Sequence, residues 1–402
     1  MATGSDKFPK IHPVSGFQLG TVSAGIKTAG RKDLVLMEIA PGSSVAGVFT
    51  QNRFCAAPVQ IAKRHLQAQT PRYLLVNTGN ANAGTGSQGE ADALDCCQAV
   101  AAATGVACQQ VLPFSTGVIG EPLPVDRLLS AIPSAVNAFS EQGWAAAAEG
   151  ILTTDTRPKG ASRRYAIGDG QITLSGIAKG SGMIKPNMAT MLGFVATDAA
   201  VDGELLHRAL RLANEKSFNR ITVDGDTSTN DAVMLIATGT SGVEIDELTF
   251  EPFVAELTDL FVELAQGIIR DGEGANKFVE VLVEGAKDTA EALQVAYTIA
   301  ESPLVKTALA ASDPNWGRIL AALGRAGIEN LDIDRVKISL NSVLIVEAGG
   351  RAAGYTEQQG QRAMQPEDIQ IRVQLNRGAV SDKIWTTDLS YDYVRINAEY
   401  RT

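Results

Sequence analysis

Histidine and cysteine are scarce in this sequence of 402 residues, which has three histidines and four cysteines. None of the histidines has a second histidine or a cysteine at the spacing of a metal site. The adjacent Cys96 and Cys97 do not form a CxxC pair, and we expect all four thiols to be free and mostly buried. The sequence therefore predicts no metal site, and a reaction that needs a histidine base has few candidates.

Long apolar runs and dense basic runs are also missing. No window approaches the roughly 18 apolar residues that a membrane-spanning helix needs. The first residues, MATGSDKFPKIHPVSGF, lack the charged-then-apolar pattern of a signal peptide. Acidic residues outnumber basic ones by 45 to 35, which gives a formal net charge of −10 without a Lys/Arg cluster. We expect a cytoplasmic protein that contacts neither a membrane nor nucleic acid.

Strand-like runs rich in Val, Ile, Leu and Thr are numerous, and several alternate with period two. Helix-like runs lie between them, and we expect Asp202 to cap one helix and Gly105 to end another. The predicted strands are 32–40, 72–79, 171–178, 190–199, 220–225, 231–239, 277–285, 336–346 and 369–378. The predicted helices are 90–105, 202–216, 251–272 and two within 302–327, interrupted near Pro314. The class is α/β or α+β, with helices covering sheets.

Two polar segments match ligand-binding loops only in part. The run GTGSQG, 84–89, fits GxGxxG, but neither a strand directly before it nor an acid about 20 residues later supports a dinucleotide fold. The run TVDGDTSTND, 222–231, has Ser228 and Thr229 where a calcium loop needs an acid or amide and then glycine. We favour a hydrogen-bonded polar loop there, whose carboxylates and hydroxyls can line a pocket.

Two glycine-containing turns allow two interpretations each. The run RDGEGANK, 270–277, is either a turn that ends a helix or a turn that projects the Glu273 carboxylate toward a cationic ligand. The run FSTGVIG, 114–120, places Thr116 and Gly117 in a short loop. Such a loop is either a plain turn or a set of N–H donors that holds an anion, as an oxyanion hole does.

The run KPNMATMLGF, 185–194, places Thr190 directly before an apolar segment. A threonine there is either an ordinary strand residue or a hydroxyl that attacks the carbonyl of Ala189 and cleaves its own chain. Cleavage would leave an N-terminal threonine whose hydroxyl is a nucleophile and whose α-amine is the base. An α-amine titrates at roughly 8, so this chemistry needs no histidine.

Taken together, these segments resemble the ornithine acetyltransferase (glutamate N-acetyltransferase) family of arginine biosynthesis. The resemblance covers essentially the whole chain, and the stretch around Thr190 is its most specific part. It rests on NTGNANAGTG, STGVIG, TTDT, KGSGMIKPNMATML, TVDGDTSTND, GEGANK, DPNWGR and the terminal RINAEYRT.

The resemblance implies an α/β layered sandwich similar in architecture to self-processing N-terminal-nucleophile aminopeptidases. It implies cleavage between Ala189 and Thr190, which gives an α chain 1–189 and a β chain 190–402. Both chains are expected to stay together in an α2β2 heterotetramer.

The resemblance also assigns roles to individual residues. Thr190 matches the nucleophile that carries the acetyl group, and Thr116 and Gly117 match the oxyanion-hole pair. The positions that match substrate-binding residues are Thr153, Lys179, Thr190, Glu273, Asn397 and Thr402. Of these, a Lys179 ammonium would suit an α-carboxylate or the glutamate side chain, and a Glu273 carboxylate would suit the ornithine ammonium.

The implied reaction moves acetyl from N-acetylornithine to glutamate through an acetyl-threonine ester, without a cofactor. The sequence leaves open whether acetyl-CoA is an additional acetyl donor. Two other functions also stay open: a self-processing amidohydrolase or aminopeptidase that passes the acyl group to water, and a metabolite-binding protein that is never cleaved.

Overall fold

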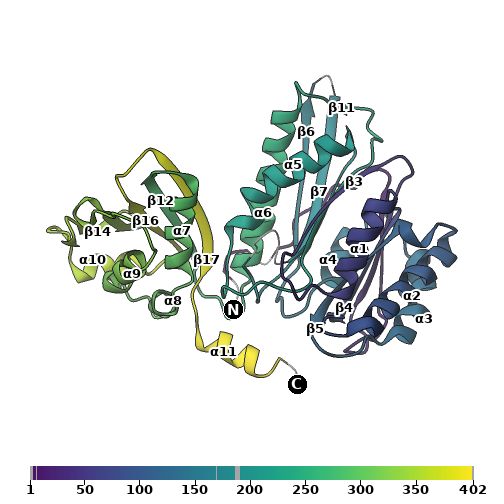
Figure 1. The fold of residues 1–402 in the computed structure, drawn as a ribbon, viewed down its shortest axis with the longest axis horizontal. Coiled ribbons are helices and arrows are strands. Elements are labelled where there is room, and N and C mark those ends of the chain that lie inside the picture. The colour runs from purple at the N-terminus through teal and green to yellow at the C-terminus, as the bar shows by residue number, and fades with distance from the viewer. Residues whose placement is uncertain (1–2, 6, 169, 186–190, 401–402) are drawn as a thin grey trace.

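The computed structural model describes residues 3–5, 7–168, 170–185 and 191–400 and shows two lobes (Figure 1). Three residues assigned from the sequence, Ala189, Thr190 and Thr402, lie outside this description. The larger lobe holds two sheets. The first has the order β1-β2-β4-β5, with β4 and β5 parallel. Its strands are β1 Phe17–Val22, β2 Leu34–Ile39, β4 Tyr73–Asn80 and β5 Val111–Val118.

The second sheet of the larger lobe has the order β3-β10-β8-β7-β6. Its two central strands, β8 and β10, run parallel to each other and are buried at every residue. A strand buried on both faces reads as a continuous apolar run rather than an alternating one, as these do. The five strands are β3 Ser44–Phe49, β6 Lys159–Ile167, β7 Gly170–Lys179, β8 Leu192–Thr197 and β10 Ala232–Ala237.

The two sheets pack face to face. Phe114 of β5 and Phe194 of β8 meet edge to face with ring centroids 5.3 Å apart, within a core that contains side chains of both sheets. Helices cover the outer faces, so the lobe has four layers, α/β/β/α. The layered α/β sandwich expected from the sequence is therefore confirmed. The covering helices are α2 Gly86–Thr104 and α3 Val125–Asn137 on one side and α5 Gly203–Glu215 and α6 Phe250–Arg270 on the other.

Smaller elements complete the larger lobe. α4 places its buried Trp144 in the core between the sheets, 5.3 Å from the ring of Phe17. These elements are α1 Ala57–Ala68, α4 Trp144–Gly150 and the two-residue strands β9 Ala200–Val201 and β11 Glu244–Ile245.

The smaller lobe has its own sheet, of order β15-β14-β13-β16-β12-β17, and its own apolar core, to which its helices contribute side chains. Its strands are β12 Phe278–Ala286, β13 Lys337–Leu340, β14 Val343–Glu347, β15 Gly350–Arg351, β16 Asp368–Gln374 and β17 Val380–Thr387. Its helices are α7 Thr289–Ala300, α8 Pro303–Ala310, α9 Trp316–Gly324 and the short α10 Glu357–Ala363.

The chain end returns from the smaller lobe to the larger one. Helix α11, Tyr391–Ala398, leaves β17 and crosses beneath the gap between the ribbons of the two lobes (Figure 1). Three hydrogen bonds hold it there: the Ser390 hydroxyl to the Gly274 carbonyl, the Tyr393 hydroxyl to Asp224 and the Asn397 amide to Glu273. Asn397 and Tyr400 are thereby brought to the larger lobe.

Most predicted elements form. The Asp202 side chain caps α5 by accepting from the Glu204 N–H, Gly105 ends α2 in a left-handed conformation, and the 302–327 segment forms two helices on either side of Pro314. All four cysteines are free, and Cys96 and Cys97 are buried.

Two strand predictions are wrong in part. Segment 220–225 forms no ladder, because Thr222 bonds to Trp385 while Val223 bonds to Ile184, which belong to different parts of the fold. Segment 336–346 forms a hairpin, β13 and β14, because Asn341 turns the chain with a φ of +50°.

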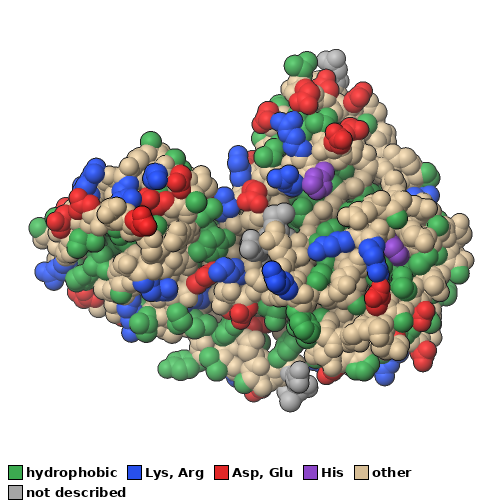
Figure 2. All heavy atoms as spheres, viewed as in Figure 1, with side chains coloured by type: hydrophobic (Ala, Val, Ile, Leu, Met, Phe, Trp, Pro, Cys, Tyr) green, Lys and Arg blue, Asp and Glu red, His purple; other side chains and the backbone are tan. Residues whose placement is uncertain are grey.

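The surface agrees with the charge pattern of the sequence. Figure 2 shows basic and acidic side chains interspersed over both lobes on the visible face. Within the described residues, no helix is long and apolar enough to cross a membrane.

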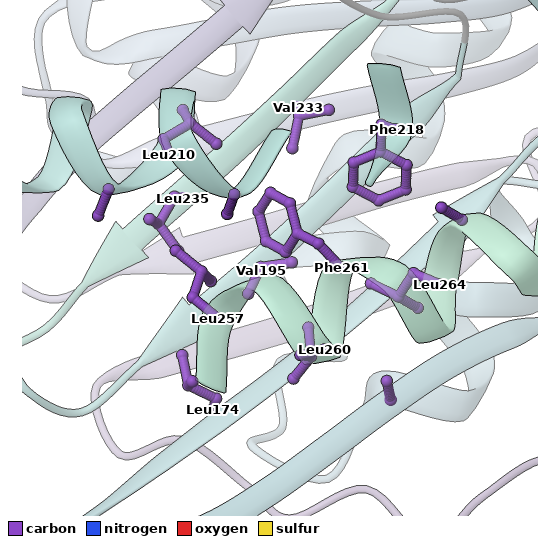
Figure 3. Close-up of a cluster of buried hydrophobic side chains, with 14 of the residues drawn as sticks. Leu174, Val195, Leu210, Phe218, Val233, Leu235, Leu257, Leu260, Phe261 and Leu264 are labelled. Carbon is purple, nitrogen blue, oxygen red and sulfur yellow. The ribbon is translucent and has the colours of Figure 1, made fainter. Parts of the chain in front are cut away.

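The core beneath α6 gives a stability prediction. Phe261 is fully buried among leucines and valines of α5, α6 and the second sheet (Figure 3), and its ring lies 5.1 Å from that of Phe218. Phe261→Ala is expected to lower the free energy of unfolding by about 3–5 kcal/mol because it leaves a cavity. Leu248→Ala, at a side chain that is 88 % exposed, should change it by less than about 0.5 kcal/mol. Urea unfolding measures both, and equal effects would contradict the packing.

Candidate active site

A cavity of about 280 Å³ opens where the two sheets meet the returning chain end. Strand ends form its floor: β5 and β7 end there, while β8 and β10 begin there. The turn after α6 and the residues around the end of α11 form the other walls. The polar side chains that line it are Thr116, Thr153, Thr154, Lys179, Ser228, Asn230, Asp231, Glu273, Asn397 and Tyr400.

Thr116 and Gly117 lie at the end of β5 rather than in the short loop predicted from the sequence. Parallel pairing with β4 extends through them, so the ladder, not a free turn, fixes their backbone. Gly117 has a φ of +136°, and a Cβ there would lie 2.2 Å from the carbonyl carbon of Gly79. Only glycine fits this position without displacing the neighbouring strand. The Asn230 amide braces the same corner by donating to the carbonyl oxygens of Ala81 and Ser115.

Lys179 joins the predicted residues into one cluster. Its buried Nζ donates to Thr116 Oγ1 at 3.1 Å and to Thr153 Oγ1 at 3.0 Å. Because the Thr116 oxygen accepts from the ammonium, its own O–H is left to donate elsewhere. Burial lowers the pKa of the Lys179 ammonium, and the Asp155 charge acts in the opposite direction. The cluster can therefore offer a hydroxyl donor backed by a positive charge.

A buried ionic network holds Lys179 in place. Asp155 accepts from the backbone N–H of Thr153 at 3.0 Å and of Gly180 at 2.8 Å, which fixes the segments on both sides of the ammonium. Lys159 bridges Asp155 and Asp271, lying 2.5 Å from the latter. Burial acts to raise the pKa of the Asp155 carboxyl, but the charges of Lys159 and Lys179 outweigh it and hold that pKa well below its usual range. Asp155 is thus a permanent counter-charge under the site.

Glu273 supplies the acidic side of the cavity. It is 8 % exposed, and its Oε2 accepts from the Asn397 amide at 2.7 Å. A Cβ on Gly182 would lie 2.4 Å from this carboxyl group, so a glycine there lets the acid reach the cavity. Segment 270–277 is the turn that ends α6, and it places Glu273 in the wall of the cavity. The cationic ligand stays a prediction.

The structure brings six of the residues assigned from the sequence to one cavity. These are Thr116, Gly117, Thr153, Lys179, Glu273 and Asn397. Ala189, Thr190 and Thr402 are not described, but Met191 and Tyr400, close to them in sequence, line the same cavity. The roles of Ala189, Thr190 and Thr402 stay predictions.

Sequence reasoning missed Asp155 and Asp231. Asp231 is 3 % exposed, lines the cavity, and has no hydrogen-bond partner for Oδ2 among the described residues. Burial raises its pKa well above the usual value. The polar run 222–231, which contains Asp231, was expected to line a pocket, and it does. For Asp155, the sequence offered only a weaker indication, which is that it belongs to the run TTDT, one of the segments that carry the resemblance. Across the described residues, no group of three or more His, Cys, Asp or Glu side chains is arranged to hold a metal ion.

Comparison with known proteins decides the family. The ArgJ family model matches residues 18–402. The chain belongs to the ArgJ family. It is 57 % identical to the "Arginine biosynthesis bifunctional protein ArgJ" of Pseudomonas syringae pv. tomato and 56 % identical to that of Pseudomonas fluorescens, with 100 % of both chains covered in each case. The "Arginine biosynthesis bifunctional protein ArgJ" of Methylococcus capsulatus is 57 % identical over 98 % of this chain and 97 % of its own.

Two solved structures of similar sequence can be compared with this ArgJ-family chain. One is an "Arginine biosynthesis bifunctional protein argJ" from Bacillus halodurans, 40 % identical, covering 51 % of this chain and 97 % of that chain with a TM-score of 0.49. The other is an "Ornithine Acetyltransferase complexed with Ornithine" from Mycobacterium tuberculosis, which is 36 % identical. The match covers 44 % of this chain and 94 % of that chain, with a TM-score of 0.39.

The buried network gives a pH-dependent prediction. Asp155→Asn should lower the free energy of unfolding at pH 7 by about 3 kcal/mol, because it leaves buried ammonium groups under-compensated. The folded pKa of Asp155 is depressed, so its contribution is present above the unfolded pKa of about 3.9 and is lost as the pH falls toward the folded value. The difference in unfolding free energy between the wild type and Asp155→Asn should therefore narrow below about pH 4.

Urea unfolding at pH 7, 5 and 3 measures this gap. Asp259→Asn, at an exposed side chain of α6, is the matched control and should show little effect at any of these values. A gap that stays constant down to pH 3 would contradict the role of the Asp155 charge.

Gly117 and Gly120 form a matched pair for a second prediction. Both have positive φ, but a Cβ on Gly120 would meet nothing within 4 Å, whereas one on Gly117 would strike Gly79. Gly117→Ala should destabilise the protein by about 1–3 kcal/mol more than Gly120→Ala, because it adds overpacking to the shared backbone strain. Urea unfolding of the two variants measures the difference, and equal losses would refute the tight approach of β4 and β5.

Proposed function

We propose that this chain is a glutamate N-acetyltransferase of arginine biosynthesis, which moves acetyl from N-acetylornithine to glutamate. One observation carries the proposal: residues matched to the family's oxyanion-hole and substrate positions, far apart in sequence, line one cavity around the Lys179 ammonium. The proposed reaction uses no cofactor. We place the protein in the cytoplasm.

The nucleophile we propose is Thr190, exposed by cleavage of the Ala189–Thr190 bond. Its hydroxyl attacks the preceding carbonyl, and the C–N bond breaks, so that the peptide becomes an ester and the Thr190 amine is freed. Water then cleaves that ester, which releases the Ala189 carboxylate and restores the Thr190 hydroxyl. This amine is then the base, so the reaction needs none of the three histidines of the chain. Met191, the next residue in the sequence, lies on the cavity wall, which supports the proposal.

The two proposed chains, 1–189 and 190–402, share one sheet. Strands β8 and β10, from after the cut, lie between β3 on one side and β7 and β6 on the other, all from before the cut. Separating the chains would break two complete strand ladders and expose the core between the sheets. We therefore propose that they stay together after cleavage. From the resemblance to the family, we also propose that two copies of each form an α2β2 assembly.

The proposed transfer has two steps. In the first, Thr190 Oγ forms a bond to the acetyl carbonyl carbon of N-acetylornithine, the C–N bond breaks, and ornithine leaves with the proton taken up by the α-amine. In the second, the glutamate amine attacks the acetyl ester, the C–O bond breaks, and the hydroxyl regains a proton. Thr116 and Gly117 would stabilise the negative charge on the carbonyl oxygen in both tetrahedral states.

Opposite charges in the cavity suit the first substrate. We propose that Glu273, which has one oxygen bonded to Asn397, pairs with the side-chain ammonium of ornithine, and that Lys179 attracts a carboxylate. Charge-assisted hydrogen bonds of this kind are the strong ones inside a protein.

An acetyl-transfer assay tests the function. N-acetylornithine labelled in its acetyl group is incubated with the protein, with and without glutamate. Labelled N-acetylglutamate that forms only with glutamate supports the proposal, and labelled free acetate with no N-acetylglutamate would favour the amidohydrolase instead. A parallel assay with acetyl-CoA as sole donor shows whether it is a second source of acetyl.

Cleavage is tested by substitution of the proposed nucleophile. Thr190→Ala should run as one full-length band on a denaturing gel and lose acetyl transfer, while the wild type should run as two fragments, the second beginning at Thr190. Thr190→Ser keeps a hydroxyl and should still be cleaved. An active wild-type protein that is a single unbroken chain would refute the proposal.

A further inference from the structure

A second cavity, of about 210 Å³, adjoins the first. The two cavities share five wall residues, Gly117, Val118, Thr153, Thr154 and Tyr400. Each is smaller than the roughly 300–1,000 Å³ of pockets for drug-sized ligands, so each suits one small group rather than a large molecule. A group bound in the second cavity would lie next to the proposed oxyanion pair.

The outer wall of the second cavity is basic. It includes Lys27 and Arg31, from the loop between β1 and β2. Within the part of the chain that the structure describes, neither makes a salt bridge, in a protein whose acids outnumber its bases. The wall also contains Asp33, but each of its oxygens accepts a backbone N–H at 2.6 Å, from Ala24 and Ile26. That carboxylate is therefore engaged in holding the loop.

Neutral contacts hold the two cations without cancelling their charge. Arg31 Nη2 donates to the carbonyl oxygens of Leu152 at 2.7 Å and Thr153 at 3.0 Å, and no partner for Nη1 or Nε is found among the described residues. Lys27 Nζ donates to the Tyr400 carbonyl at 3.2 Å and lies 5.4 Å from the centroid of the Tyr400 ring. Both side chains keep donors for an anion at this cavity.

The two proposed substrates need binding sites of opposite charge for their side chains. The proposed acetyl donor has a cationic side chain, and the proposed acceptor has an anionic one. Glu273 and Asn397 line the first cavity but not the second, and Lys27 and Arg31 line the second but not the first. In the first cavity the Lys179 ammonium already donates to Thr116 and Thr153, and an anionic side chain placed against Glu273 would be repelled. One placed in the second cavity would meet Lys27 and Arg31, for which no salt bridge is found among the described residues.

We propose that the second cavity is an anion subsite, in which Lys27 and Arg31 hold the side-chain carboxylate of the acetyl acceptor. This inference rests on the proposed function and adds to it: the two amino acids use the same reaction centre, but their side chains occupy different cavities. Thr153 lies between the two sets of charges, since its carbonyl accepts from Arg31 and its hydroxyl accepts from Lys179.

The test compares glutamate with glutamine as acceptors. Glutamine has the same shape but no side-chain charge, and both acceptors react with the same acetyl-enzyme. The ratio of their kcat/KM values therefore reports only the recognition of the carboxylate, and a general loss of catalysis does not move it. Lys27→Gln and Arg31→Gln should each lower this ratio about tenfold or more, the usual effect of losing one charge-assisted hydrogen bond.

Two further variants sharpen the experiment. Lys32→Gln is the matched control, because Lys32 belongs to the same loop, pairs with Glu149 at 2.6 Å and does not line the cavity. It should leave the ratio unchanged. Lys27→Arg keeps the positive charge and should restore most of the preference for glutamate.

The other possible results distinguish a failure of the subsite from a failure of the proposed function. If the wild type transfers acetyl to glutamate but neither Gln variant changes the ratio, the subsite is refuted while the function stands. If the variants instead raise the KM for acetyl-CoA and leave the ratio unchanged, the anion held is a phosphate of a thioester donor, and the assignment to the acceptor is overturned. If the wild type forms no N-acetylglutamate from N-acetylornithine, the proposed function itself fails.

Discussion

The geometry of the active site depends on one buried ammonium group. Lys179 lies at the end of β7, where it binds the hydroxyls of Thr116 and Thr153 at once. A charge in that position is costly unless it is compensated, and Asp155 compensates it while also fixing the backbone of Thr153 and Gly180. The same carboxylate is bonded to Lys159, which continues to Asp271 at the end of α6. Within this network, the buried carboxylates of Asp155 and Asp271 are therefore paired with the Lys159 ammonium.

This network also links segments on both sides of the proposed cut. Asp155, Lys159 and Lys179 precede position 190, whereas Asp271 and Glu273 follow it. The second sheet shows the same interleaving, since β8 and β10 lie among strands from the first half. A chain built in this way can lose one peptide bond without losing its fold, because the contacts that hold the halves together are buried ladders and ion pairs rather than the backbone link.

The returning chain end gives the site its second feature. Helix α11 buries none of its residues, yet Asn397 bonds to Glu273, and Tyr400 forms a wall common to both cavities. A short exposed helix is held by a few polar contacts, so the position of this wall depends on those contacts more than on packing. The cavity that contains Glu273 and the one bordered by Lys27 and Arg31 share Thr153 and Gly117 in their walls, which suits the proposed enzyme because it would accept a cationic and then an anionic amino acid.

The sequence by itself determined many of the local elements and, through its resemblance, the family and the residues of the proposed site. Helices with strong period and clear caps, such as α5 and α6, were predictable because their signals are local. Segment 220–225 and the position of Gly117 at a strand end were not, since both depend on partners far away in the chain. Likewise, only the tertiary structure decided that Asp155 lies under Lys179, that Asp231 lines the cavity and that Lys27 and Arg31 border a second one. Burial, charge pairing and the shape of a cavity arise from contacts between distant segments, and no run of neighbouring residues encodes them.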